Sequence, residues 1–253
     1  MCHPEVPPGT VAPAVRTEEV QVPLIAPERM PALLALPERL PGPPVLVVND
    51  VGGRSPFYEN LTRRLAQAGF VALDPDYFFR EGPVPAGDRP ATMARRGRLD
   101  QKRTLRDLEA AIDWLRKRPD VRGAYLGTIG FCMGGTLVLD LAVTGKVRAT
   151  VTYYGFPKVE AAPLAPPEPL SVAERTKGSI LGWWGDQDAG VGMENVTALD
   201  EKLTRAKVEH EFHVYPGLGH GFLKAFLEDE SSPGYREACE SWTRTLEFLR
   251  ESL

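Results

Sequence analysis

Residues 126–142, LGTIGFCMGGTLVLDLA, decide the fold of this chain. The apolar run 124–129 predicts a strand and the pattern after Gly134 predicts a helix, so Cys132 stands in the turn between them. A glycine two residues before the cysteine and another two residues after it complete the G-x-nucleophile-x-G pattern, with cysteine in the position of serine. We predict that Cys132 is a nucleophile at the carboxyl end of a parallel strand, where ligands bind in open sheets. The alternative is a buried thiol whose glycine neighbours only allow close packing.

The predicted turn has consequences for the chemistry of Cys132. A strained strand-to-helix turn leaves no room for a Cβ atom at Gly130 and Gly134, and it lifts the cysteine side chain clear of the sheet. The thiol then lies at the positive end of a helix, which stabilises the thiolate and lowers its pKa. The backbone N–H of Met133 would face an oxygen on the carbon that Cys132 attacks, which makes it one half of a predicted oxyanion hole.

Two later segments supply the partners that a cysteine nucleophile needs. The apolar strand in SILGWWGDQDAGV (179–191) breaks into an acidic turn with Asp188, and the strand in EHEFHVYPGLGHGF (209–222) breaks into a glycine-rich turn with His220. The chain order is therefore nucleophile, acid and histidine, with each residue after the end of a strand. We predict that Asp188 orients His220 and that His220 is the general base for Cys132.

Other residues near these turns have simpler explanations. Asp186 is an alternative acid, but its place directly after Gly185 predicts a turn-capping role. His210 and His213 lie inside the preceding strand, where we expect packing or surface roles. Only His220 follows the end of a strand with a glycine on each side.

The rest of the chain alternates strands with helices, which predicts an α/β fold. Such an alternation produces right-handed crossovers and a mostly parallel sheet, here of about seven to eight strands, with helices on both faces. A turn-rich connection follows residue 73 and leads to a helix around residues 105–115. The other expected strands are 18–24, 30–37, 43–49, 70–73, 149–154, 179–184 and 209–215, and the other expected helices are 55–68, 193–205 and 233–249.

We expect one main domain over residues 17–253, because 253 residues with 43% hydrophobic content suffice for one α/β core. Residues 1–16 are rich in proline and predict an extended arm. Adjacent Cys2 and His3 in this arm lack a second ligand pair, so we predict no metal site there. The proline-rich insertion 156–177 predicts a long, semi-rigid loop, either a partial lid over a pocket or a passive surface loop.

The charge balance excludes several classes of partner. Thirty basic against 34 acidic residues give a formal charge of −4, so no broad basic surface is available for nucleic acid or anionic lipid. No apolar run reaches membrane-spanning length, and we expect a cytoplasmic protein without a targeting leader. The three cysteines have unrelated spacings, which predicts reduced thiols. The histidines and carboxylates lack ligand spacing, so we expect no metal and no other cofactor.

Taken together, these motifs resemble those of the dienelactone hydrolase (carboxymethylenebutenolidase) family of α/β-hydrolases. The resemblance covers the chain from about Thr17 to its end and rests on three ordered motifs, GFCMGG, GDQDAGV and GLGHGF. The segments DPDYF (74–78) and DLEAAIDWL (107–115) add to it. It implies the α/β-hydrolase fold, a small-molecule lactone or ester as substrate, and a monomer or small homo-oligomer.

The resemblance also implies further site residues. In the family an acidic residue after the third strand contacts the resting cysteine, and the next backbone N–H completes the oxyanion hole. Asp50 and Val51 occupy these positions, although the family residue is typically glutamate. Two arginines bind the substrate carboxylate in the best-known members. The second position holds Lys224 here, and an ungapped count places the first at Arg89, with Arg95, Arg96 and Arg98 close by.

The expected reaction is hydrolysis of a lactone or activated ester through a thioester on Cys132. A thiol has an ordinary pKa of about 8.5, so the tetrahedral intermediate expels thiolate more readily than a basic alkoxide. Cysteine therefore suits esters with good leaving groups, such as the enolate of an enol lactone. One alternative is a broad carboxylesterase on aryl or short acyl esters, with Lys224 serving only the surface. A second alternative is not an enzyme: it is a thiol sensor on a hydrolase scaffold, which would need neither Asp188 nor His220.

Overall fold

A computed structural model of the chain describes residues 10–85, 87–160 and 163–253. The strands are β1 Arg16–Pro23, β2 Arg29–Leu36, β3 Pro44–Val48, β4 Val71–Pro75, β5 Gly127–Phe131, β6 Ala149–Tyr153, β7 Ser179–Gly185 and β8 His210–Tyr215. The helices are α1 Pro56–Gln67, α2 Arg89–Arg98, α3 Gln101–Arg116, α4 Met133–Ala142, α5 Pro169–Val172, α6 Met193–Ala206 and α7 Tyr235–Ser252, with 3₁₀ turns η1 Ala173–Arg175 and η2 Phe222–Leu227.

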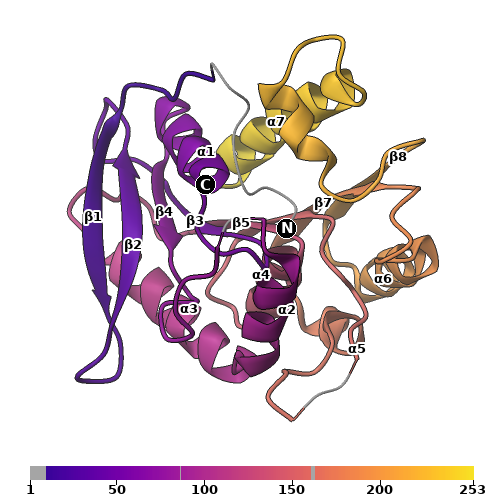
Figure 1. Ribbon diagram of the computed structural model, residues 1–253, viewed down its shortest axis with the longest axis horizontal. Coiled ribbons are helices and arrows are strands. Elements are labelled where there is room, and N and C mark those ends of the chain that lie inside the picture. Colours follow the sequence, from indigo (N-terminus) through magenta and orange to yellow (C-terminus); the bar gives the residue numbers. More distant parts are fainter. Residues whose placement is uncertain (1–9, 86, 161–162) are drawn as a thin grey trace.

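The strands form one eight-stranded sheet in the order β1-β2-β4-β3-β5-β6-β7-β8. β2 pairs antiparallel with β1 and β4, and all pairings from β4 across to β8 are parallel. Helices α1 and α7 cover one face of the sheet, and α3, α4 and α6 cover the other (Figure 1). The predicted α/β fold, with a mostly parallel sheet between two helical layers, is confirmed.

The central strands are short and fully buried, which suits a sheet covered on both faces. β3, β4, β5 and β6 each contain five residues, and every one of them is buried. Strands of this kind read as continuous apolar runs rather than as an alternation of apolar and polar residues. Helix α4 is also buried along its whole length. The carboxyl end of β5 and the start of α4 therefore lie at the centre of the molecule.

The structure corrects one predicted boundary and adds one helix. The strand before Cys132 begins at Gly127 and not at residue 124, because Tyr125 is 54% exposed in the turn that precedes it. The connection after β4 also contains a separate helix, α2, which was not predicted. Asp88 caps this helix by accepting a hydrogen bond from the N–H of Ala91 at 2.9 Å. Its buried residues, Thr92 and Arg95, are polar, so it lacks the apolar periodicity that identifies a helix.

The segment 156–177 is a long connection that ends in the short turns α5 and η1. Residues on its first half are held against the start of α3, because the N–H of Lys102 donates to Leu164 O at 3.1 Å and its ammonium donates to Pro163 O at 2.9 Å. Residues 10–15 form no helix or strand. Most of the predicted arm, including Cys2 and His3, lies outside the described residues.

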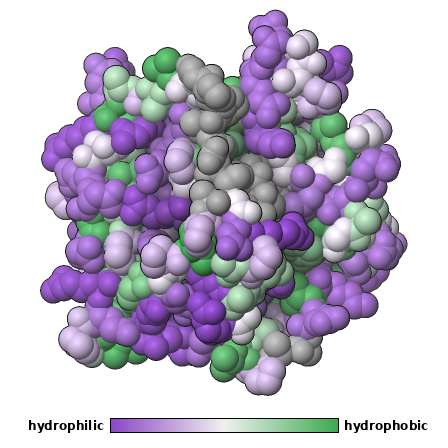
Figure 2. Space-filling view, viewed as in Figure 1, coloured by the Kyte–Doolittle hydropathy of each residue, from purple (hydrophilic) through white to green (hydrophobic). Residues whose placement is uncertain are grey.

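Polar residues predominate on the face in Figure 2, and hydrophobic residues appear there as separate patches. Among the described residues, no helix combines the length and the apolar character needed to cross a bilayer.

Candidate active site

Cys132 lies in a sharp turn between β5 and α4. Its backbone has φ 55° and ψ −118°, an unusual conformation for a residue with a side chain. A Cβ atom on Gly130 would lie 2.2 Å from Gly134 O, and one on Gly134 would lie 2.1 Å from Val48 O. Both glycines are therefore required by contact with neighbouring backbone, as the sequence pattern predicts. The turn leaves Cys132 9% exposed at the amino end of α4.

The loops after β7 and β8 bring a carboxylate and an imidazole together. Asp188 Oδ2 lies 2.5 Å from His220 Nδ1. The Asp188 side chain is 3% exposed and that of His220 is 26% exposed. Asp188 Oδ1 also accepts a hydrogen bond from the N–H of Val191 at 3.3 Å, which fixes the carboxylate. This arrangement holds the imidazole in one orientation, with Nε2 left for a reaction partner.

The environment of His220 favours its protonated form. Two aromatic rings pack beside the imidazole, Tyr154 with ring centroids at 4.9 Å and Phe156 at 5.6 Å. Burial lowers the pKa of His220, but hydrogen bonds to Asp188 and Cys132 and the charges of both residues raise it more, to about 9. Cys132 and Asp188 therefore both contact the same imidazole.

The loop after β3 packs directly against the turn at Cys132. A Cβ atom on Gly134 would lie 2.3 Å from Asn49 O, so the start of α4 and this loop touch through backbone. Asp50 is 1% exposed, and its Oδ1 accepts a hydrogen bond from the N–H of Gly52 at 2.6 Å. Within the described parts of the chain, the N–H of Val51 makes no hydrogen bond. The N–H of Val51 and that of Met133 are thus available on two adjoining segments.

A cavity of about 1070 Å³ opens over these residues. Its floor contains Cys132 and Met133, and its sides come from α2, from the first half of the 156–177 segment and from the loop after β7. Described residues of the insertion therefore form part of the cavity wall. The lining residues are Val51, Arg89, Thr92, Met93, Arg96, Gly97, Leu99, Gln101, Cys132, Met133, Thr136, Phe156, Lys158, Val159, Glu160, Pro163, Leu164, Ala165, Gln187, Asp188, Ala189, Gly190 and His220.

Three cations line this cavity, and the predicted anion-binding pair is only partly among them. Arg89 and Arg96 project from α2 and Lys158 from the insertion. All three residues are exposed, and within the described residues none of them forms an ion pair. Lys224 is exposed on η2 and does not line the cavity. Sequence reasoning missed Lys158, and the only available signal was its position in the proline-rich insertion.

The other acidic and histidine candidates have structural contacts. Asp186 Oδ1 accepts a hydrogen bond from the N–H of Gly217 at 2.7 Å and so joins the loops after β7 and β8. His210 is bonded through both ring nitrogens, to Val208 O at 2.8 Å and to an oxygen of Asp200 at 3.1 Å. His213 stacks on the ring of Trp183 with centroids 4.3 Å apart.

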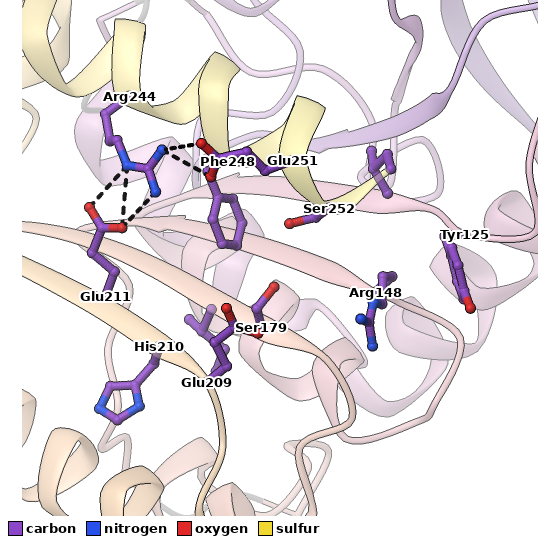
Figure 3. A pocket seen from close by; sticks show the side chains of 12 residues that line it. Tyr125, Arg148, Ser179, Glu209, His210, Glu211, Arg244, Phe248, Glu251 and Ser252 are labelled. Atoms are coloured by element: carbon purple, nitrogen blue, oxygen red, sulfur yellow. Dashed lines mark hydrogen bonds and ion pairs between the residues drawn. The ribbon is translucent and has the colours of Figure 1, made fainter.

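A second cavity, of about 470 Å³, lies at the amino ends of β6, β7 and β8 (Figure 3). Arg244 fills one side, where it bonds to Glu211 and Glu251. Ser179 and Ser252 also line it, but the nearby His210 has both ring nitrogens engaged and is not free to act as a base for either hydroxyl. This cavity contains no activated nucleophile. Among the described residues, no three His, Cys, Asp or Glu side chains are grouped to hold a metal ion.

Comparisons with known proteins agree with this geometry. The family model described as "Dienelactone hydrolase family" matches residues 30–253. The "Carboxymethylenebutenolidase" of Rhodococcus opacus is 33% identical over 213 residues, which are 84% of this chain and 82% of the relative. The "Probable 2-oxo-3-(5-oxofuran-2-ylidene)propanoate lactonase" of Bradyrhizobium sp is 29% identical over 211 residues, 82% of this chain and 83% of the relative.

A solved structure gives the same result at the level of the fold. The crystal structure of "Putative Dienelactone Hydrolase" from Klebsiella pneumoniae subsp. pneumoniae superposes with a TM-score of 0.85 at 27% sequence identity. The match covers 94% of this chain and 99% of the other chain, so no large part of either fold is left without a counterpart.

Proposed function

The chain belongs to the dienelactone hydrolase family of carboxylic ester hydrolases and has the α/β-hydrolase fold, and from this premise we propose that it hydrolyses a lactone or activated ester through Cys132, His220 and Asp188. The observation that carries the proposal is the shared imidazole. His220 contacts Asp188 at 2.5 Å through Nδ1, and it is hydrogen-bonded to Cys132. A nucleophile, a base and an orienting acid in this relation form the unit needed for covalent acyl transfer.

The first step is attack by the Cys132 thiolate on the substrate carbonyl. With a pKa of about 9, His220 is protonated at neutral pH, which favours a resting pair of thiolate and imidazolium. A bond forms between Sγ and the carbonyl carbon, and the carbonyl oxygen becomes an oxyanion. The N–H groups of Val51 and Met133 stabilise that charge. Asp50, buried beside Val51, is our candidate for the acid that contacts the resting thiol.

Collapse of the intermediate breaks the carbon–oxygen bond to the leaving group, and the His220 imidazolium supplies the proton that the departing oxygen takes up. The product is a thioester on Cys132. Thioester formation removes the thiolate charge that raised the pKa of His220, so the imidazole becomes a better base for the next step. His220 then takes a proton from water, the hydroxide attacks the thioester, and the thiolate leaves.

The cavity supports an anionic substrate. Arg89, Arg96 and Lys158 are exposed on its wall without ion-pair partners among the described residues, and guanidinium groups bind carboxylates in a bidentate way. The name of the relative from Bradyrhizobium specifies a lactone with a propanoate group. We therefore propose a lactone or enol ester that carries a carboxylate, which Arg89 and Arg96 bind. Lys224 has no part in this scheme.

One observation favours a second candidate, a carboxylesterase that acts on neutral aryl esters. Lys224, which the family resemblance places in the carboxylate site, is exposed and lies outside the cavity. Steady-state rates for a dienelactone and for a neutral aryl ester of similar leaving-group pKa separate the two. A kcat/KM at least about tenfold higher for the anion supports carboxylate recognition, since that factor corresponds to one good charged contact. Equal values favour the aryl esterase.

Mass spectrometry of the protein quenched during turnover of a slow activated ester tests the mechanism itself. We expect one acyl adduct, located on Cys132, that disappears after the ester is consumed. Cys239 is half-buried on α7 and serves as an internal control for non-specific acylation of thiols. An adduct on another residue, or full activity in Cys132→Ala, would refute the mechanism. Loss of turnover with a persistent adduct in His220→Gln would support the assigned role in deacylation.

A further inference from the structure

The loop from Asn49 to Gly52 is held by two side chains that have no assigned role. Tyr77 Oη donates toward Asn49 O at 2.8 Å and toward Asp50 O at 3.0 Å. Arg95 Nη2 donates to Val51 O at 3.2 Å and to Gly52 O at 2.7 Å. Four consecutive carbonyl oxygens are therefore fixed from outside the loop, two by a phenol and two by a guanidinium.

The carbonyl of Asp50 belongs to the same peptide unit as the N–H of Val51. A trans peptide is planar, and its N–H points in the direction opposite to its C=O. When Tyr77 holds the oxygen of this unit on one side, the Val51 N–H must point to the other side. Val51 lines the same cavity as Cys132 and Met133, so this part of the loop borders the site. A hydrogen bond to the carbonyl also polarises the peptide and strengthens its N–H as a donor.

The two side chains are themselves locked in place. Tyr77 is 1% exposed and Arg95 is 4% exposed. Phe78 lies between them, with its ring centroid 4.7 Å from that of Tyr77 and 4.1 Å from the Arg95 guanidinium carbon. Arg95 also donates to Gly82 O at 3.3 Å, which ties the connection after β4 to α2. Neither group can follow a movement of the loop without breaking this stack.

Both groups remain hydrogen-bond donors throughout the working pH range. Burial raises the pKa of Tyr77 well above its usual value, and the negative charges of Asp50 and Cys132 raise it further. The phenol is therefore never a phenolate at neutral pH. Burial lowers the pKa of Arg95, while the negative charges of Asp76, Glu81 and Asp50 oppose that change. A guanidinium stays protonated under such conditions.

We propose that Tyr77 and Arg95 are positioning residues that aim the Val51 N–H at the oxyanion by holding the carbonyls of Asn49 to Gly52. This inference rests on the proposed hydrolysis at Cys132. It does not require contact between either side chain and the substrate. It assigns α2 a structural role at the site in addition to its two cavity arginines.

Tyr77→Phe tests the phenol, because it removes one hydroxyl and keeps the ring that packs on Phe78. Two rates on Cys132 are compared: acylation by an activated ester, measured by stopped flow, and alkylation by iodoacetamide. Alkylation of a thiolate forms no oxyanion, so it does not use the Val51 N–H. We expect acylation to slow by about 10- to 100-fold, as for a displaced catalytic donor. The alkylation rate at each pH and the KM for the ester should stay within about twofold of the wild-type values, because nothing else at the thiol changes.

Arg95→Lys tests the guanidinium, since lysine keeps the charge but cannot bridge two carbonyls in a fixed fork. We expect the same selective loss of acylation. Tyr125→Phe and Arg98→Lys are matched controls, one in the second cavity and one exposed at the end of α2, and both should match the wild type.

The outcomes are distinct. Equal acylation in Tyr77→Phe and wild type overturns the inference while leaving the proposed function intact. Parallel loss of acylation and alkylation also overturns it, because it indicates general damage to the site. Absence of any adduct on Cys132 in the wild-type protein refutes the proposed function instead.

Discussion

At the scale of single residues, His220 links the geometry of the site to its pH dependence. Burial alone would make this histidine neutral, but its contacts with Asp188 and Cys132 raise its pKa from 6.5 to about 9. The imidazolium is the proton donor for the leaving group in the first half of the reaction. A substrate with a basic leaving group therefore depends on the protonated form, and a substrate with a very good leaving group does not.

We therefore expect kcat/KM for an enol lactone or a poorly activated ester to fall above a pH of about 9, as His220 loses its proton. For a nitrophenyl ester the high-pH fall should be absent, because nitrophenolate leaves without a proton. Asp188→Asn should shift the fall to lower pH, since the main favourable contact of the imidazolium is weakened. Rate profiles from pH 5 to 10 measure all three. Identical profiles for the two ester types would contradict the assigned proton transfer.

The residue types and their order in the chain were enough to predict that Asp188 pairs with His220. Contacts between residues on distant parts of the chain could not be predicted in this way. The acid and the histidine each follow a strand, and the parallel sheet brings those strand ends together. Arg95 contacts Val51 and Gly52, which lie about 43 positions away in the chain, and no local sequence pattern predicts such contacts. The family resemblance placed Lys224 near the substrate, but Lys224 lies on η2 with its side chain exposed and does not line the cavity.

At the scale of elements, the prediction succeeded where apolar periodicity defines a strand or helix. The buried runs of β3, β6 and β7 were located to within one or two residues because each is continuous and bounded by turn residues. Helix α2 was missed because arginine, proline and glycine dominate its sequence, RPATMARRGR. Its stability comes from the Asp88 cap, which is a local contact, and from the burial of Arg95, which is a tertiary feature.

The contact between α4 and β3 makes a sharp prediction about stability. A Cβ at Gly134 would lie 2.1 Å from Val48 O, and backbone cannot move aside cheaply. We expect Gly134→Ala to lower the free energy of unfolding by about 2 to 4 kcal/mol, in the range of severe overpacking. Gly97→Ala in α2 is the matched control, because its Cβ would have no neighbour within 4 Å. It should raise stability by about 0.5 to 1 kcal/mol through helix propensity. Urea unfolding measures both, and equal effects would contradict the contact.

Helix α2 also makes a prediction about selectivity. Arg89 and Arg96 line the cavity seven residues apart, which places both on one face of the helix. We expect the double change Arg89→Gln and Arg96→Gln to lower kcat/KM for an anionic lactone by about 10- to 100-fold, the value of charged contacts to a carboxylate. The rate for a neutral aryl ester should stay the same. Arg98→Gln on the exposed end of α2 is the control. A uniform loss for both substrates would indicate a structural role instead.

At the scale of the whole molecule, several buried groups make stability depend on pH in one direction. Burial raises the pKa of Asp74 from 3.8 to about 7, although Arg54 and Asn49 oppose it. Burial also raises the pKa of Asp140 in α4 well above its usual value, and Oδ2 of this carboxyl has no hydrogen-bond partner among the described residues. In both cases the folded chain holds a proton that the unfolded chain has released, so stability is lost as pH rises above about 4.

His220 does not add to this trend. Its pKa in the folded chain, about 9, lies above the ordinary value of 6.5, but in the proposed resting pair Cys132 has lost the proton that His220 gains. At about pH 7.5 the pair therefore holds as many protons as the thiol and the neutral imidazole of the unfolded chain. Carboxylates with lowered pKa act in the opposite direction, but in another range. The hydrogen bond to Arg80 lowers the pKa of Glu28 to about 2. Its contribution to stability therefore increases as pH rises from about 2 to 4.5 and is constant above that range. These groups therefore do not cancel the loss between pH 5 and 9.

We expect the melting temperature to fall between pH 5 and pH 9, and Asp140→Asn identifies one cause. The amide keeps the shape of the side chain but cannot ionise, so the cost of a buried carboxylate at pH 8 disappears. The variant should be more stable than the wild type at pH 8 by about 1 to 2 kcal/mol, a rise of about 2 to 8 °C for a chain of this length. At about pH 3.5 the two should melt within about 1 °C of each other, because the wild-type carboxyl is then largely protonated in both the folded and the unfolded chain. Asp113→Asn on α3, where the carboxylate is 47% exposed and paired with Lys146, is the control and should not gain stability at pH 8. A melting temperature that rises with pH, or an Asp140→Asn variant that gains equally at both pH values, would contradict ionisation of the buried carboxyl as the cause.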